Sequence, residues 1–263
     1  MLRFNANDGS AMAGYIAFAM LLAMFPFVIV AVMVASLIIG LEQSRATIAA
    51  LVELLPPNVA DTIEPMLLDV VKVDRGSVLT LSALVAVWSS SSGVEAFRTA
   101  FDRAYEVEDP RPIWLSRLVA IAIVFLGTAT FLVAGVGIVF GPLLFHLLGE
   151  VFGIVAPGSV TALRYTLGVI VFIFFLLVLH LVLPPWRRGR RLWPGVIVTA
   201  LLWFAGAVAF SVYLRYAPSF TITYGTMAGV VVTMLFFYLT GAVIIYGAEL
   251  NASLGRLRVW GRA

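Results

Sequence analysis

Six long, nearly uncharged apolar segments constrain this chain more than any other feature. A bilayer core of about 30 Å is crossed by roughly 20 helical residues, and each segment is at least about that long. Membrane barrels are instead built from short strands that alternate polar with apolar residues. The sequence therefore predicts an all-α, polytopic membrane protein, a bundle of six transmembrane helices. The predicted spans are 12–40, 78–97, 115–144, 161–183, 192–214 and 224–248.

The composition supports one integral membrane domain over residues 1–263. Of all residues, 62% are hydrophobic and only 12% are charged, which is far more apolar than an ordinary soluble domain. No tract in the sequence is long and polar enough to act as a linker between domains. The first apolar run exceeds the short core of a signal peptide, so we expect it to remain as the first span.

Basic residues are distributed unequally between the two predicted faces. Twelve arginines fall on one face and five basic residues fall on the other. Short cytoplasmic loops retain Arg and Lys, so the face with twelve is predicted to be cytoplasmic. Both termini lie on that face, which predicts a multi-pass protein with both ends in the cytoplasm.

The segment 41–77, between the first two spans, is polar but patterned. Its apolar residues recur at helical spacing, and it carries six acidic residues against three basic ones. We expect an external amphipathic helical segment that forms an acidic cap. Two roles are open for this cap: it either covers apolar helix ends or gates a cavity.

The second span is the least lipid-like, and it carries the main candidate site. Four serines at 89–92 interrupt its apolar run. Ser91, Glu95, Arg98 and Asp102 follow one another at offsets that place them on one face of a helix. Ionisable groups in membrane helices are expensive and often functional, so this stripe is a candidate substrate-binding surface.

Glu249 and Asn251 lie near the end of the sixth span, at about the same predicted depth. We therefore expect Arg98 to face either Glu249 or Glu95. One interpretation is a polar, substrate-binding cavity near the cytoplasmic ends of the second and sixth helices. The other is an ion pair that only locks helix ends together.

Two further features have both a functional and a structural interpretation. Pro26 lies within the first span, where a proline removes a backbone hydrogen bond and is expected to kink the helix at a hinge. A run of arginines precedes the fifth span and either binds anionic lipid headgroups or only sets the topology. This run consists of Arg187, Arg188, Arg190 and Arg191.

Catalytic motifs are not found in the sequence. It has no cysteine, and its two histidines, His146 and His180, lack histidine partners, so we expect no metal, no cofactor and no enzymatic activity. The basic residues cluster beside apolar runs, which argues against a nucleic-acid partner. One acidic cluster is interpreted as a solvated helix end. It consists of Asp102, Glu106, Glu108 and Asp109.

Several stretches resemble the YihY/BrkB family of bacterial inner-membrane proteins. They are Ala17-Phe18 followed by Phe25-Pro26, Leu55-Pro56-Pro57, the segment 88–92 with Phe101 and Tyr105, Tyr213, Tyr224-Gly225-Thr226 and Gly247-Ala248-Glu249-Leu250-Asn251. The resemblance implies six helices, the bacterial cytoplasmic membrane and a role linked to the cell envelope. The family was once named ribonuclease BN, but metal-dependent RNA cleavage needs clustered acids or histidines on a wet, basic surface, and the predicted cytoplasmic loops offer only short stretches.

Two functions follow as hypotheses. The first is a transporter or lipid-handling protein with membrane lipids as partners and a small-molecule or lipid substrate of unknown identity. The alternative is a noncatalytic envelope scaffold or assembly factor. A homo-oligomer is compatible with both.

Overall fold

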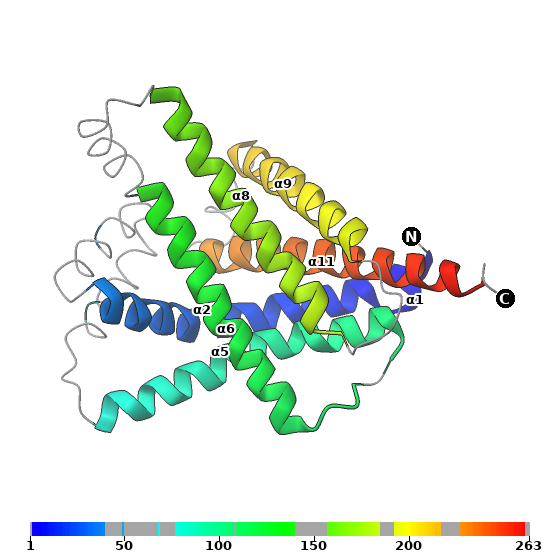
Figure 1. Ribbon diagram of the computed structural model, residues 1–263, viewed down its shortest axis with the longest axis horizontal. Coiled ribbons are helices and arrows are strands. Elements are labelled where there is room, and N and C mark those ends of the chain that lie inside the picture. The colour runs from blue at the N-terminus through cyan, green and yellow to red at the C-terminus, as the bar shows by residue number, and fades with distance from the viewer. Residues whose placement is uncertain are drawn as a thin grey trace.

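The computed structural model describes residues 2–39, 49, 68, 77–107, 109–139, 157–184, 192–216 and 227–260. Within these ranges the chain is helical and contains no strand, which confirms the predicted all-α class. The helices are α1 (Leu2–Ala6), α2 (Gly9–Ile39), α5 (Ser77–Tyr105), α6 (Ile113–Val139), α8 (Pro157–Val182), α9 (Trp193–Tyr216) and α11 (Ala228–Trp260) (Figure 1).

Five of the described helices are long and apolar enough to cross a membrane. This confirms a polytopic helical membrane protein. The sixth long helix, α5, has 29 residues and so reaches about 44 Å at 1.5 Å per residue, but it is more polar than the others. The five apolar segments are Gly9–Ala31, Ile113–Val133, Tyr165–Val182, Trp193–Tyr216 and Ala228–Arg256.

Two helices extend well beyond the spans that hydropathy predicts. The second span was predicted to end at residue 97, whereas α5 continues to Tyr105, and the sixth was predicted to end at 248, whereas α11 continues to Trp260. Both extensions carry charged residues, so hydropathy cannot detect them although the backbone remains helical. The predicted cap at 41–77 falls outside the described residues, apart from Ala49, Leu68 and Ser77.

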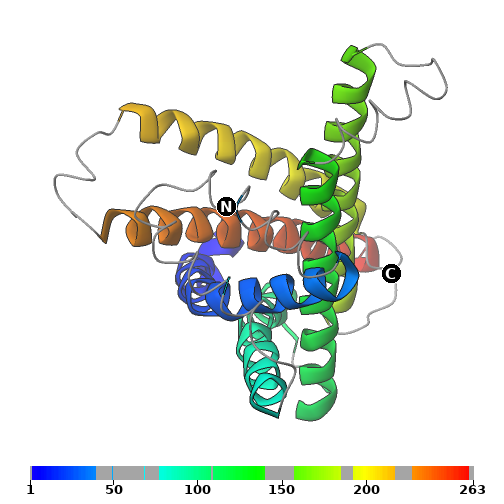
Figure 2. The same ribbon diagram turned by 90° about the vertical axis from the view of Figure 1, so that its left-hand side faces the viewer.

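The helices form two groups that cross. α2 packs against α5 and α11, and α11 also packs against α9. α6 and α8 lie side by side and cross α2 and α11 steeply in both views (Figures 1 and 2). The buried core joins both groups through Ile16, Phe101, Leu176, Val196 and Ala248.

Glycines allow α9 and α11 to approach closely. A Cβ added to Gly247 would overlap the Thr199 hydroxyl and lie 2.8 Å from the carbonyl oxygen of Gly195. A Cβ added to Gly195 would overlap Gly247 and Asn251 in turn. Small residues are favoured where membrane helices pack backbone against backbone. The two glycines therefore fix the distance between these helices.

The two ends of the described chain lie at the same end of the molecule. The C-terminal half of α11 extends past α1 and the start of α2 (Figure 1), and α1 contacts α11. Which side of the membrane they occupy stays a prediction from the arginine count. Pro26 lies inside α2, and the helix continues through it from Gly9 to Ile39, so the expected hinge also stays a prediction.

Candidate functional site

The last turn of α5 ends in a hydrogen-bonded backbone motif. The amide of Glu106 donates to the carbonyl of Arg103 and that of Val107 donates to the carbonyl of Asp102, both at 3.0 Å. This pair of bonds is a Schellman motif, which requires a left-handed residue after the helix. Glu106 occupies that position with a φ of 54°, where glycine is more usual.

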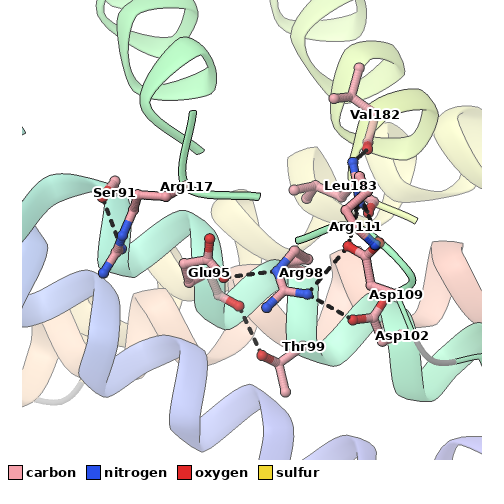
Figure 3. A network of polar contacts seen from close by, with 10 residues as sticks. All are labelled: Ser91, Glu95, Arg98, Thr99, Asp102, Asp109, Arg111, Arg117, Val182 and Leu183. Atoms are coloured by element: carbon pink, nitrogen blue, oxygen red, sulfur yellow. Dashed lines mark hydrogen bonds and ion pairs between the residues drawn. The ribbon is translucent and has the colours of Figure 1, made fainter. Parts of the chain in front are cut away.

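A chain of ion pairs runs along the end of α5 (Figure 3). Arg98 Nε donates to Glu95 Oε2 at 2.8 Å, and Arg98 Nη1 lies 3.3 Å from Asp102 Oδ2. Glu95, Arg98 and Asp102 thus lie together as predicted, and Arg98 contacts Glu95, one of its two expected partners. Each side chain is about one-fifth exposed, so the guanidinium is shielded but reaches the surface.

Asp109 extends this chain from α5 to α8. Its side chain is only 2% exposed and accepts from both Arg98, at 3.3 Å, and Arg111. Arg111 in turn donates to the last carbonyls of α8, at 3.0 Å to Val182 and 2.6 Å to Leu183 (Figure 3). A cation at a helix C-terminus satisfies carbonyls without helical partners and complements the helix dipole. Asp109 and Arg111 thus tie the turn after α5 to the end of α8.

Ser91 belongs to a separate contact with α6. It is fully buried, donates to the carbonyl of Trp88 at 2.6 Å and accepts from Arg117 Nη1 at 3.0 Å. The Arg117 guanidinium also lies 4.2 Å from the centre of the Trp88 ring, a cation–π geometry. Ser91 therefore helps to hold α5 against α6, away from the ion-pair chain.

The other two predicted residues, Glu249 and Asn251, are not brought to Arg98. Glu249 is 5% exposed and accepts from the Asn7 side-chain amide at 2.6 Å, which ties α11 to the turn before α2. Asn251 is fully buried and accepts from the Gly195 amide at 2.7 Å while donating to the carbonyl of Leu192 at 3.0 Å. Its side chain thereby caps the first turn of α9.

An open, shallow depression of about 460 Å³ lies beside the ion-pair chain. The predicted cavity was to be shared by α5 and α11, but the lining comes only from α5 and the segment after it, because Glu249 and Asn251 are engaged elsewhere. The lining includes acids and bases, so a ligand there would meet charges of both signs. The lining residues are Arg98, Thr99, Asp102, Arg103, Glu106, Val107 and Asp109.

Two ion pairs from neighbouring elements reach the rim of this depression. Arg103 Nη1 lies 3.2 Å from Asp8 Oδ2, in the turn between α1 and α2. Glu106 Oε2 lies 3.0 Å from Nη1 of Arg256, on α11. α11 therefore contributes to this region through Arg256, and not through the two residues that the sequence singled out.

The two aspartates beside Arg98 titrate in opposite directions. Burial raises the pKa of Asp102 to about 6, and the charges of Asp109 and Glu95 add to this rise although Arg98 and Arg111 oppose it. Burial also acts on Asp109, but its hydrogen bonds and charge contacts with Arg111 outweigh that effect and lower its pKa. Asp102 Oδ1 is buried, and among the described residues it has no hydrogen-bond partner.

The acidic cluster was interpreted as a solvated helix end, and this interpretation is wrong for Asp109. Asp109 is buried and forms ion pairs to two arginines, while Glu106 is half exposed. Glu108 is outside the described residues. Sequence reasoning also missed Arg111, Asn7 and Arg256 as partners, since their contacts span up to 242 positions and follow no periodic pattern.

The arginines predicted to bind lipid headgroups lie outside the described residues. They are Arg187, Arg188, Arg190 and Arg191. Within the described ranges, no three His, Cys, Asp or Glu side chains are grouped in a way that could hold a metal ion.

Several known proteins are similar to this chain over nearly its whole length. YfkH of Bacillus subtilis, which is named a ribonuclease-like protein, is 27% identical over 96% of this chain and 92% of its own length. UPF0761 membrane proteins of Chromohalobacter salexigens and Pseudoalteromonas atlantica are 29% and 25% identical over 97% and 93% of this chain. The chain spans 62% and 81% of those two relatives. No solved structure matches. The family described as Virulence factor BrkB matches residues 1–261, and this membrane protein belongs to it.

Proposed function

We propose that this protein is a lipid-handling membrane protein or transporter that receives a polar headgroup in the depression at the end of α5. The observation that carries the proposal is the depression itself, which is open and lined by two arginines and three acidic residues. Such a surface suits a small, charged group that is accessible from the membrane surface.

The depth of the depression supports a headgroup as its ligand. The predicted span ends at residue 97, and the lining begins at Arg98, so the depression is expected at the level of the lipid headgroups. Trp114 and Trp193 are 65% and 59% exposed at the starts of α6 and α9. Tryptophans are enriched at membrane–water interfaces, so their positions agree with this depth.

The floor of the depression is preorganised by the buried ion pairs. Arg98 is held by Glu95, Asp102 and Asp109, so it does not have to be ordered when a ligand arrives. Groups that are already fixed lower the entropic cost of binding.

Reconstitution of the full chain tests the proposal. Vesicles of mixed phospholipids with a trace of tail-labelled lipid would be assayed for lipid binding and for transfer of the labelled lipid between leaflets. We expect binding, and we expect Thr99→Phe to reduce it because the larger side chain fills the depression. Arg117→Gln is the matched control, since it removes a polar contact between α5 and α6 outside the depression.

The outcomes separate the two hypotheses. Loss of binding in the Thr99 variant, with binding retained in the Arg117 variant, supports lipid handling. If the wild-type protein binds no lipid above a protein-free control, the proposal is wrong. If depression variants lower only the amount of folded protein and leave lipid binding per molecule unchanged, a scaffold function is favoured instead.

A further inference from the structure

Four arginines in or beside the depression differ in how firmly they are held. Arg98 contacts three carboxylates, and Arg111 contacts one carboxylate and two carbonyls of α8. The Nε and Nη2 atoms of Arg256 are buried. The Arg103 side chain is 49% exposed, and within the described residues Asp8 is its one carboxylate partner. Arg103 is therefore the most accessible guanidinium that lines the depression.

The partner of Arg103 is also exposed. The Asp8 side chain is 67% exposed, and its Oδ2 atom lies 3.2 Å from Nη1 of Arg103. Exposed ion pairs contribute little stability because water and salt screen them. An anion can therefore replace Asp8 on Arg103 at small cost. A guanidinium also presents parallel N–H donors that fit the oxygens of a phosphate.

The turn that carries Asp8 is anchored on both sides. Phe4 packs against the core, and its ring lies 2.5 Å from the position of a Cβ added to Gly9. The side chain of Asn7 donates to the buried Glu249 at 2.6 Å. Asp8 itself has a φ of 54°, which reverses the chain between α1 and α2. The turn thus keeps a carboxylate beside Arg103, where it acts at a high effective concentration.

We infer that Arg103 binds the phosphate of a phospholipid and that Asp8 is a built-in competitor for this arginine. Without a ligand, Asp8 occupies the guanidinium. When a phosphate binds, the Arg103 donors turn to the phosphate oxygens and the Asp8 carboxylate is left in water, so the anchored turn does not have to move. The inference rests on the proposed function and adds the residue that recognises the ligand and the contact that restrains it.

The other arginine in the lining is poorly suited to this role. Arg98 compensates the charge of Asp109, whose side chain is only 2% exposed. Removing one partner of a buried ion pair is strongly destabilising because it leaves a buried charge without compensation. A phosphate that took Arg98 would carry this cost, whereas a phosphate on Arg103 would not. Arg98 therefore remains part of the floor while Arg103 exchanges partners.

Lipid titrations of the full-length protein in detergent, measured by native mass spectrometry, test the inference. The probes are phosphatidylglycerol, phosphatidylcholine and diacylglycerol with identical acyl chains. We expect both phospholipids to bind and diacylglycerol, which has no phosphate, to bind at least about tenfold more weakly, the effect of losing a hydrogen bond to a charged group. Inorganic phosphate is added as a competitor. Displacement at millimolar concentration assigns the site to a free phosphate compound, and its absence assigns the site to a lipid.

A double-mutant cycle tests the competition between Asp8 and the ligand. Asp8→Asn should tighten phospholipid binding by about two- to fivefold, the range expected for an exposed ion pair. Arg103→Gln should weaken binding at least about tenfold. In the Arg103→Gln background, Asp8→Asn should have no further effect, because the two residues act through one contact. Gly255→Ala is the control, since an added Cβ there meets no atom within 4 Å.

The outcomes separate the inference from the proposed function. Arg103→Gln that binds phospholipid like the wild type, or diacylglycerol that binds as tightly as the phospholipids, would overturn the phosphate assignment and leave the proposed function standing. Equal tightening by Asp8→Asn in both backgrounds would overturn the competition, since the effect would then be long-range electrostatics. Failure of the wild type to bind any lipid would overturn the proposed function. If Arg103→Gln does not fold, Asp8→Asn still decides, because unchanged or weaker binding contradicts the competition.

Discussion

Arg98 Nη1 lies 3.3 Å from Asp109 Oδ2, and these two residues are eleven positions apart. The contact joins the end of α5 to the segment that leads into α6. Asp109 is almost fully buried, so its charge depends on Arg98 and Arg111 for compensation.

Replacing Asp109 by Asn should therefore destabilise the protein strongly. The substitution keeps the shape of the side chain but leaves two arginines with one fewer carboxylate, which costs about 2–4 kcal/mol for a buried pair. Thermal unfolding of the purified protein in detergent measures the effect. Asp8→Asn is the matched control, because its pair with Arg103 is exposed and should change the melting temperature little.

Replacing Arg111 by Lys should loosen the end of α8. Arg111 donates to two carbonyls and to Asp109 at once, whereas a lysine ammonium lacks the planar fork that reaches all three. We expect a loss of about 1–2 kcal/mol in stability. Hydrogen exchange should increase in the last turn of α8. Unchanged exchange there would show that Arg111 does not stabilise these carbonyls.

Replacing either of two glycines on α11 by alanine should change the stability of the protein, but in opposite directions. Gly247→Ala places a methyl group against Thr199 and Gly195 and should destabilise the protein by about 2–3 kcal/mol. Gly255→Ala meets nothing within 4 Å and should stabilise the helix by about 0.5–1 kcal/mol. Melting temperatures of the two variants provide the comparison. A similar shift for both would contradict the close crossing of α9 and α11.

The stability of the protein should depend on pH through Asp102. Its pKa is about 6 in the fold and 3.8 as the ordinary value, so folding takes up a proton between these limits. The contribution of Asp102 is complete below about pH 4 and is lost as the pH rises through about 6. Melting temperatures of the wild type and Asp102→Asn between these pH values test this. The wild type should lose stability relative to the variant as pH rises, and parallel curves would count against the shift.

The helical fold was predictable because its main signal is local. An apolar run of sufficient length identifies a membrane helix without knowledge of its neighbours, so all six predicted spans correspond to described helices. The ends of α5 and α11 were not predictable in this way. Charged residues continue both helices, and hydropathy treats charge as the end of a span.

The candidate site was predictable only within one helix. Glu95, Arg98 and Asp102 follow helical periodicity, so their shared face could be recognised from spacing. Asp109 and Arg111 join the site because α6 and α8 cross the other helices, and the sequence does not specify that crossing. Glu249 was expected near Arg98 from its depth alone, but rotation about the axis of α11 directs it toward Asn7.

The amide of Asn251 has a consequence for movement within the bundle. One side chain on α11 both accepts from and donates to the first turn of α9, beside the glycine crossing. Sliding or rotation between the two helices would break both bonds and leave buried polar groups without partners. These two bonds therefore oppose movement of α9 relative to α11 at this crossing. Any opening of the bundle has to occur at other helix interfaces.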